Sequence, residues 1–110
     1  MHGMKRKQPL SFFDRVHTLV ATVPVGYVTT YGAIAKAMGT KDARRVGHAL
    51  HANTDPKNIP CHRVVFSDGR LAPGYAFGGP DEQKKRLELE GVKFTTSNTV
   101  DLKNFLYPLG

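Results

Sequence analysis

Two short helical patterns separated by one glycine constrain the fold of this chain more than any other feature. Residues 33–38 carry apolar side chains at helical spacing, and Gly39 ends that pattern. Thr40 is the predicted N-cap of a second helix, over residues 41–51. A short helix, a glycine-containing turn and a second helix together predict a helix-turn-helix, a motif that often binds DNA. The motif alone is weak evidence, because glycine turns join many helix pairs.

The segment before this pair and the segments after it are also short. Ser11 and Asp14 have capping-box spacing at the start of a first helix, which Pro24 is expected to end. The stretch CHRVVF at 61–66 is rich in β-branched and aromatic residues and predicts a short strand. Residues 81–90 predict a polar helix that ends at Gly91.

These elements predict one mainly α domain with short strands, of winged helix-turn-helix type, over residues 10–110. Residues 1–9 lack any periodicity and contain three of the chain's Lys and Arg residues, so we expect a mobile basic lead. The chain has 110 residues, which suits one modest core. We expect a monomer.

The positive charge of the chain is unevenly distributed. The formal net charge is +7, and all of this excess lies in residues 1–63, whereas residues 64–110 carry equal numbers of basic and acidic residues. A polyanion such as nucleic acid would bind such a surface, although a merely soluble surface explains it too.

Composition also restricts the cellular compartment. A single cysteine excludes an internal disulfide and fits a reducing environment. No apolar run approaches the length of a membrane span, so we expect no membrane partner. The expected location is the cytoplasm, associated with the nucleoid, or the nucleus in a eukaryote. One cysteine with scattered histidines makes a poor metal site, so none is predicted.

Cys61, the single cysteine, lies in the stretch NIPCHRVV between Pro60 and His62. A free cysteine is most often a small buried hydrophobic residue. A thiolate beside an imidazole, however, is a nucleophile with a lowered pKa. Neighbours along a strand point to opposite faces, so His62 would reach the sulfur only through an irregular backbone or a water molecule. Both interpretations of Cys61 stay open at this point.

IPCHRVV resembles the active-site signature of the O6-alkylguanine-DNA alkyltransferases. The resemblance continues in the family's order through VPVGYVTTYGAIAKAMG, ARRVGHAL, HANTDPKNIPCHRVV and LELEG, over about residues 12–92. It implies a helix-turn-helix protein that enters the minor groove of duplex DNA, rotates O6-alkylguanine out of the stack and moves the alkyl group irreversibly to a cysteine. The resemblance implies no cofactor.

The resemblance also implies residue roles. Cys61 would attack the alkyl carbon, His62 would take its proton through water, and Glu90 would orient His62. Asn53 would brace the turn before the active-site strand, and Tyr31 would promote rotation and protonate the guanine. The expected DNA contacts are Arg44, which would fill the vacated space in the stack, together with Tyr31, Arg45, Thr30 and Lys41. The expected substrate pocket consists of Val64, Tyr75, Ala76 and Phe77.

Two features depart from the family pattern. The additional N-terminal domain of many family members is not found in these 110 residues, and the loop GRLAPGYAFGGP lacks the family's serine. Both favour an alternative, in which the chain resembles the alkyltransferase-like proteins that bind O6-alkylguanine without repairing it and flag it for nucleotide excision repair proteins. Cys61 argues against that alternative, since those relatives usually replace the cysteine. A plain winged-helix DNA-binding module is the third possibility.

Overall fold

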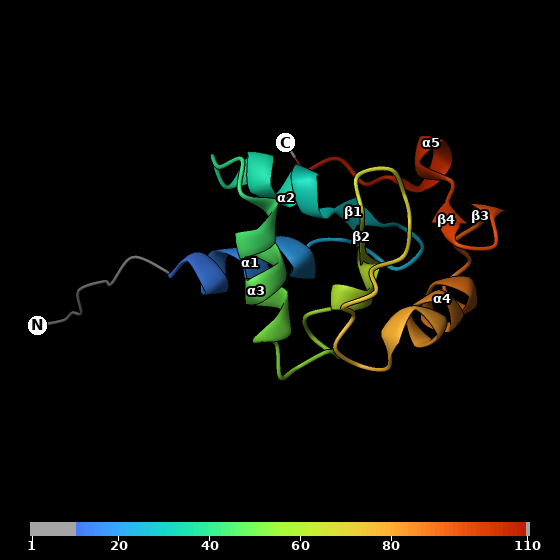
Figure 1. Ribbon diagram of the computed structural model, residues 1–110, viewed down its shortest axis with the longest axis horizontal. Helices are drawn as coiled ribbons and strands as arrows, with labels where there is room; N and C mark the ends of the chain where they lie inside the picture. Colours follow the sequence, from blue (N-terminus) through green and yellow to red (C-terminus); the bar gives the residue numbers. More distant parts are fainter. Residues whose placement is uncertain (1–10, 110) are drawn as a thin grey trace, which may run out of the picture.

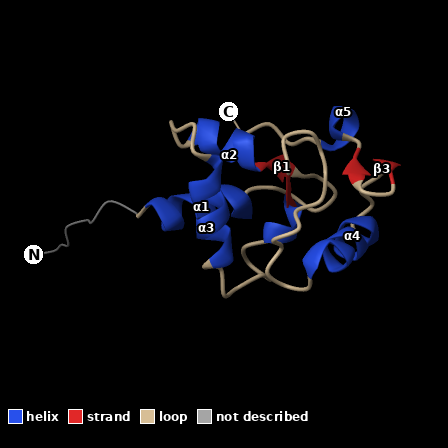
Figure 2. Ribbon diagram, viewed as in Figure 1, coloured by secondary structure: helices blue, strands red, loops and turns tan. Residues whose placement is uncertain are grey.

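The computed structural model describes residues 11–109, and the predicted lead at residues 1–9 lies outside them. The described chain is a mainly α domain with short strands, as the sequence predicted (Figures 1 and 2). No helix in it is long and apolar enough to cross a membrane. Its elements are α1 (Phe12–Ala21), β1 (Thr29–Thr30), α2 (Tyr31–Ala37), α3 (Ala43–His51), a 3-10 turn (Cys61–Arg63), β2 (Val64–Val65), α4 (Gly79–Leu89), β3 (Phe94–Thr96), β4 (Thr99–Val100) and α5 (Leu102–Phe105).

Helix α1 begins where the sequence predicted and ends earlier. The Ser11 side chain caps it by accepting a hydrogen bond from the backbone N–H of Asp14, at 3.1 Å. The helix ends at Ala21 rather than at Pro24. Proline disfavours the helical conformation of the residue before it, so the chain leaves the helix before Pro24 is reached.

Helices α2 and α3 form the predicted helix-turn-helix around Gly39, which has a positive φ of 76°. The predicted cap of α3 was wrong. Asp42, not Thr40, is the N-cap, because its carboxylate accepts a hydrogen bond from the backbone N–H of Arg45. The Thr40 hydroxyl instead accepts from the backbone N–H of Asp42, which places Thr40 in the turn before the helix.

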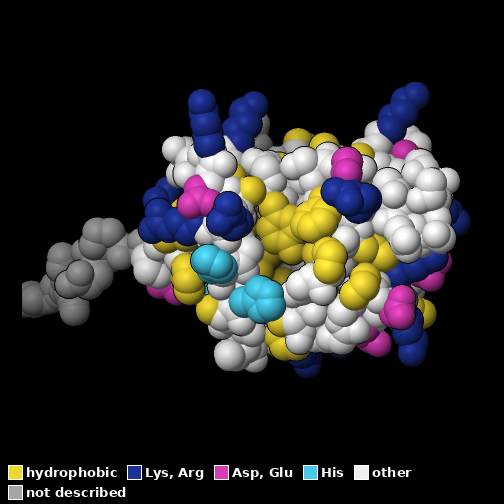
Figure 3. Space-filling view, in the orientation of Figure 1, with side chains coloured by type: hydrophobic (Ala, Val, Ile, Leu, Met, Phe, Trp, Pro, Cys, Tyr) yellow, Lys and Arg dark blue, Asp and Glu magenta, His cyan; other side chains and the backbone are white. Residues whose placement is uncertain are grey.

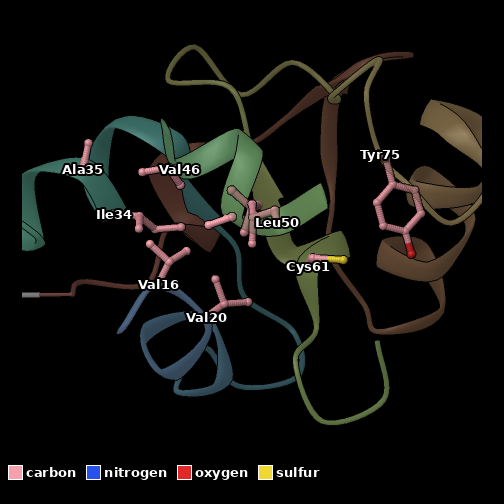
Figure 4. Packing of buried hydrophobic residues seen from close by; sticks show 10 residues of the cluster. Val16, Val20, Ile34, Ala35, Val46, Leu50, Cys61 and Tyr75 are labelled. Atoms are coloured by element: carbon pink, nitrogen blue, oxygen red, sulfur yellow. The ribbon is translucent and has the colours of Figure 1, made fainter. Parts of the chain in front are cut away.

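The first of two buried clusters lies where α1, α2 and α3 meet, and Figure 4 shows its side chains converging. Val16 and Val20 come from α1, Ile34 from α2, and Val46 and Leu50 from α3. Full burial of such a side chain contributes about 1.5–3 kcal/mol. Cys61 and Tyr75 belong to the same cluster, so the core of the helix-turn-helix continues to the cysteine.

The predicted strand at residues 61–66 is reduced to β2. Residues Cys61–Arg63 form a 3-10 turn, closed by a hydrogen bond from Arg63 N–H to the Pro60 carbonyl at 2.9 Å. The strand prediction was wrong for residues 61–63. Strand β2 pairs in parallel with β1 at only two positions, Thr29 with Val64 and Thr30 with Val65, so the sheet does not reach Cys61.

A second cluster lies beneath α4 and the β3–β4 hairpin. It contains Val28, Val65, Leu87, Val92 and Val100 among its fully or nearly fully buried residues. The chain after α5 returns to β1, where Tyr107 N–H donates to the Val28 carbonyl at 2.8 Å. The C-terminal segment therefore packs back onto the domain. Separately, Gln83 of α4 donates to the His62 carbonyl in the turn that carries Cys61.

Candidate functional site

A cavity of about 650 Å³ opens between α3 and the loop of residues 66–76. Figure 3 shows an apolar hollow on this face, with basic side chains gathered to one side and histidines next to it. Among the lining residues are Tyr31, Arg44, His48, His51, Cys61 and Tyr75.

Cys61 sits at the cavity on the 3-10 turn that follows Pro60. The residue is 5% exposed, and its sulfur points toward the side on which Tyr75 lies (Figure 4). The Cys61 N–H donates to the Ile59 carbonyl at 2.7 Å, which fixes the start of the turn. The cysteine is thus both a buried core residue and a cavity-lining one.

Glu90 forms hydrogen bonds with the two residues that directly follow the cysteine, His62 and Arg63. Nε2 of His62 lies 2.9 Å from Oε2 of Glu90, and Arg63 donates to both carboxylate oxygens at 2.9 and 2.8 Å. Arg63 also donates to the Val23 carbonyl, at 2.8 Å. Because Glu90 accepts from Nε2, the imidazole carries its proton there, and Nδ1 keeps a free lone pair. Nδ1 is buried and has no hydrogen-bond partner among the described residues.

The electrostatics of the site keep the resting thiol neutral. Burial raises the pKa of Cys61, and the Asn53 side chain and the charge of Arg86 only partly oppose this. Burial also lowers the pKa of His62 below 6.5, although Glu90 acts in the opposite direction. Burial raises the pKa of Glu90, but hydrogen bonds from Arg63 and His62 outweigh it, so the net pKa is lowered. At neutral pH the set contains a thiol, a neutral imidazole and a carboxylate.

Tyr31, the first residue of α2, lines the cavity and packs on Phe66 with ring centroids 5.8 Å apart. Burial, followed by the negative charge of an ionised Cys61, raises the pKa of Tyr31 to about 12. The phenol therefore stays protonated at neutral pH, and its hydroxyl is available as a hydrogen-bond donor.

Asn53 follows α3 and holds the turn that leads to Pro60. Its Nδ2 donates to the Ile59 carbonyl at 2.8 Å, and its Oδ1 accepts from the Asp55 N–H at 2.7 Å. Since Ile59 in turn accepts from Cys61, Asn53 connects the end of α3 to the cysteine through one peptide unit.

The predicted DNA-contacting residues lie in different settings. Arg44 is exposed and lines the cavity, and Lys41 is exposed in the turn before α3. Arg45 stacks on the ring of Phe12, 3.9 Å from its centroid. Thr30 is buried, and its hydroxyl caps α2 by accepting from the Ala33 N–H.

Only two of the four predicted pocket residues line the cavity. Tyr75 and Ala76 line the cavity, whereas Val64 is fully buried in the first cluster and Phe77 packs against that cluster and Tyr75. The Tyr75 hydroxyl accepts a hydrogen bond from Arg86 at 2.8 Å.

Sequence reasoning missed three residues that organise the site, namely Arg63, Gln83 and Arg86. Gln83 and Arg86 of α4 and its C-cap, Glu90, have helical spacing at positions i, i+3 and i+7. That spacing is readable in the sequence once Glu90 is assigned to the site. For Arg63 the only sequence signal is its place directly after His62.

Residues 11–92 match the family described as 6-O-methylguanine DNA methyltransferase, DNA binding domain. The chain is 39% identical over 104 residues to a DNA base-flipping protein of Escherichia coli, covering 92% of this chain and 78% of that one. It is 39% identical over 101 residues to a bifunctional methyltransferase/endonuclease of Picrophilus torridus, covering 91% of this chain but only 33% of that relative.

Solved structures give the same result. The crystal structure of Schizosaccharomyces pombe Atl1 in complex with damaged DNA containing O6-carboxymethylguanine superimposes with a TM-score of 0.76 at 35% identity, covering 87% of this chain and 94% of that chain. The Mycobacterium tuberculosis O6-methylguanine methyltransferase superimposes with a TM-score of 0.64 at 38% identity, covering 76% of this chain and 50% of that chain. The chain therefore belongs to the family of the 6-O-methylguanine DNA methyltransferase DNA-binding domain.

Proposed function

We propose that this protein binds duplex DNA containing O6-alkylguanine, rotates the modified base into the cavity and transfers its alkyl group irreversibly to Cys61. The observation that carries the proposal is the cysteine at the cavity followed by a histidine whose Nε2 is held by Glu90 and whose Nδ1 is free. This arrangement has the logic of a nucleophile, a base and an orienting carboxylate.

Helix α3 supplies the DNA-binding side of the proposal. Arg44 stands at the cavity, and no salt bridge engages a basic residue of α3 within residues 11–109. Unpaired cations on one helix attract phosphates and give binding that weakens with salt. Arg44, placed beside the cavity, fills the space that the rotated base leaves in the stack.

The transfer step forms a bond between Cys61 Sγ and the alkyl carbon and breaks the bond between that carbon and guanine O6. Nδ1 of neutral His62 takes the thiol proton through a bridging water, and Glu90 stabilises the resulting imidazolium. The electron pair of the broken bond passes to the guanine, which takes a proton from Tyr31 at the ring. The Tyr31 phenolate then regains a proton through water from the His62 imidazolium, so the net change moves the thiol proton to the guanine. The products are guanine and S-alkylcysteine, so each molecule acts once.

Recognition without transfer is the second candidate. It is favoured by the raised pKa of Cys61 and by the absence of a serine in residues 70–80, where the loop offers apolar side chains instead. In that case the protein holds the extruded base and recruits nucleotide excision repair proteins.

The deciding experiment is the intact mass of the protein after incubation with a duplex containing one O6-methylguanine, followed by peptide mapping. Transfer predicts a gain of one methylene unit on Cys61, absent in Cys61→Ala, while this variant retains selective binding to the modified duplex. Selective binding without a mass change supports the second candidate. Equal affinity for modified and unmodified duplexes would leave only a plain DNA-binding module.

A further inference from the structure

Gln83 is a fully buried polar residue of α4 to which the proposed transfer assigns no role. Its side chain makes three hydrogen bonds, all to backbone groups. Nε2 donates to the carbonyls of His62 and Val64, at 3.1 and 2.8 Å. Oε1 accepts from the N–H of Ala72, at 2.9 Å.

These three backbone groups belong to two different segments next to the cavity. His62 and Val64 lie in the 3-10 turn and strand that follow Cys61, whereas Ala72 lines the cavity from the loop. The amide orientation is fixed, because two carbonyls need donors and one N–H needs an acceptor. No carboxylate or apolar side chain of the same size offers both kinds of group.

One turn farther along α4, Arg86 holds the same loop at a second point, through the hydroxyl of Tyr75. Of these two segments, Arg86 binds only the loop, through Tyr75, whereas Gln83 binds both the loop and the 3-10 turn that contains Cys61. A loss of the Gln83 bonds would take one partner from each of two carbonyls and from one N–H inside the protein, so the turn and the loop would move apart or rearrange.

We propose that Gln83 is a positioning residue that fixes the loop wall of the cavity relative to Cys61 and His62. The inference rests on the proposed function for its effect on transfer. Its effect on cavity geometry is independent of transfer. By holding the His62 carbonyl, Gln83 sets the backbone from which the imidazole extends, and by holding Ala72 it sets the distance between the loop and the sulfur.

Two variants separate the bonds from the packing. Gln83→Met keeps a similar volume and removes all three bonds. Gln83→Glu keeps an acceptor for Ala72 but, when ionised, has no donor for the two carbonyls. A buried carboxyl facing carbonyl oxygens can titrate as high as about pH 8, and its protonated form regains one donor. Val100→Ala is the control for lost stability alone. The Val100 side chain lies in the second cluster and does not line the cavity, and the substitution keeps the backbone hydrogen bond from Val100 to Gly69 of the loop.

Three measurements at conditions where every variant is folded test the inference: hydrogen exchange of the Ala72 amide, the binding preference for O6-methylguanine duplex over unmodified duplex, and the single-turnover transfer rate. We expect Gln83→Met to lose Ala72 protection and binding preference, and to transfer on the order of 100-fold more slowly. Gln83→Glu should keep Ala72 protection, and its transfer rate relative to wild type should rise as pH falls. A stability effect alone would not produce that pH dependence in folded protein.

The inference is overturned if both variants keep the wild-type binding preference and transfer rate, or if Val100→Ala reproduces their losses. If wild type binds selectively but does not transfer, the transfer proposal fails, whereas the binding preference of Gln83→Met and the exchange of Ala72 still test Gln83.

Discussion

Two sets of polar groups at the site are used differently. The α3 side consists of the α3 groups that line the cavity, and the α4 side consists of the groups of α4 and its C-cap that hold the cysteine turn and the loop. Arg44, His48 and His51 line the cavity from α3, and none of them takes part in a salt bridge among residues 11–109. On the α4 side, the side chains of Gln83 and Glu90 are hydrogen-bonded to other groups of the protein. The polar groups on α3 thus stay available to an external anion, whereas Gln83 and Glu90 are committed to holding the cysteine turn and the loop.

The same division is visible in the charge of the whole chain. All three Arg–carboxylate pairs of the described residues lie between residues 63 and 90, where basic and acidic residues are close to balance. Asp14 and Asp42, within the basic residues 1–63, form no salt bridge among residues 11–109. Asp42 caps α3, and Asp14 lies in the first turn of α1. The two sides should therefore fail in different ways when they are mutated.

The largest expected effect is on the α4 side, for Glu90→Gln. A glutamine amide can donate to Nε2 of His62, which would move the ring proton to Nδ1 and remove the base, so transfer should slow by at least about 100-fold. Binding to the modified duplex should change little. Single-turnover rates and affinities measure both, with Glu88→Gln, exposed on the same helix, as the control. A loss of affinity that matches the loss of rate would break the distinction between the two sides.

Acid should remove the contribution of Glu90 to stability. The pKa of Glu90 is lowered in the folded protein from an ordinary value of 4.5. Its stabilisation is therefore fully present above that value and is lost as pH falls through the lower, folded pKa. Wild type should exceed Glu90→Gln by about 2 kcal/mol in free energy of unfolding at neutral pH, with the difference shrinking in acid. Urea titrations at neutral and strongly acidic pH would show this, and a constant difference would contradict it.

Arg44→Ala tests the α3 side. Because Arg44 is exposed and unpaired, its loss should leave the free energy of unfolding within about 0.5 kcal/mol of wild type. Affinity for the modified duplex should fall about tenfold, and affinity for unmodified duplex less. Lys41→Ala is the matched comparison, since an ordinary phosphate contact would weaken both duplexes equally and reduce the salt slope by about one. Equal losses for Arg44→Ala on both duplexes would make Arg44 a phosphate contact too.

The smallest effect is expected for Arg45→Ala. Its guanidinium stacks on Phe12, so the variant should lose about 0.5–1 kcal/mol of stability, measurable by thermal or urea unfolding. Lysine at the same position should recover only part of this. If Arg45→Ala instead weakened DNA binding as much as Arg44→Ala at unchanged stability, the stack would not restrain the side chain.

Local signals explain which parts of the fold were predictable. The cap at Ser11, the glycine at position 39 and the stop at Gly91 are each set by a few neighbouring residues, and the corresponding helices were placed within a few residues. The 3-10 turn at Cys61 was missed because β-branched content predicts a strand, whereas the pairing partner that limits the strand lies more than thirty residues away.

Long-range contacts explain what was missed at the site. His62 and Glu90 were assigned from a family resemblance, and their contact spans 28 residues. Gln83 resembles a solvent-exposed residue of a polar helix, and only the approach of two other segments makes it the most enclosed polar group of α4. A sequence pattern reports helix faces, but it does not report which backbone groups will need partners inside.

The loop of residues 66–76 is attached to α4 at two places, through the Ala72 amide and the Tyr75 hydroxyl. Between and beyond these attachments lie Gly74 and Ala76, which line the cavity. Side chains introduced there would alter the shape offered to an alkyl group without removing either attachment. Natural variation or laboratory evolution at these two positions can thus change the shape of the cavity while the contacts among His62, Arg63 and Glu90 are kept.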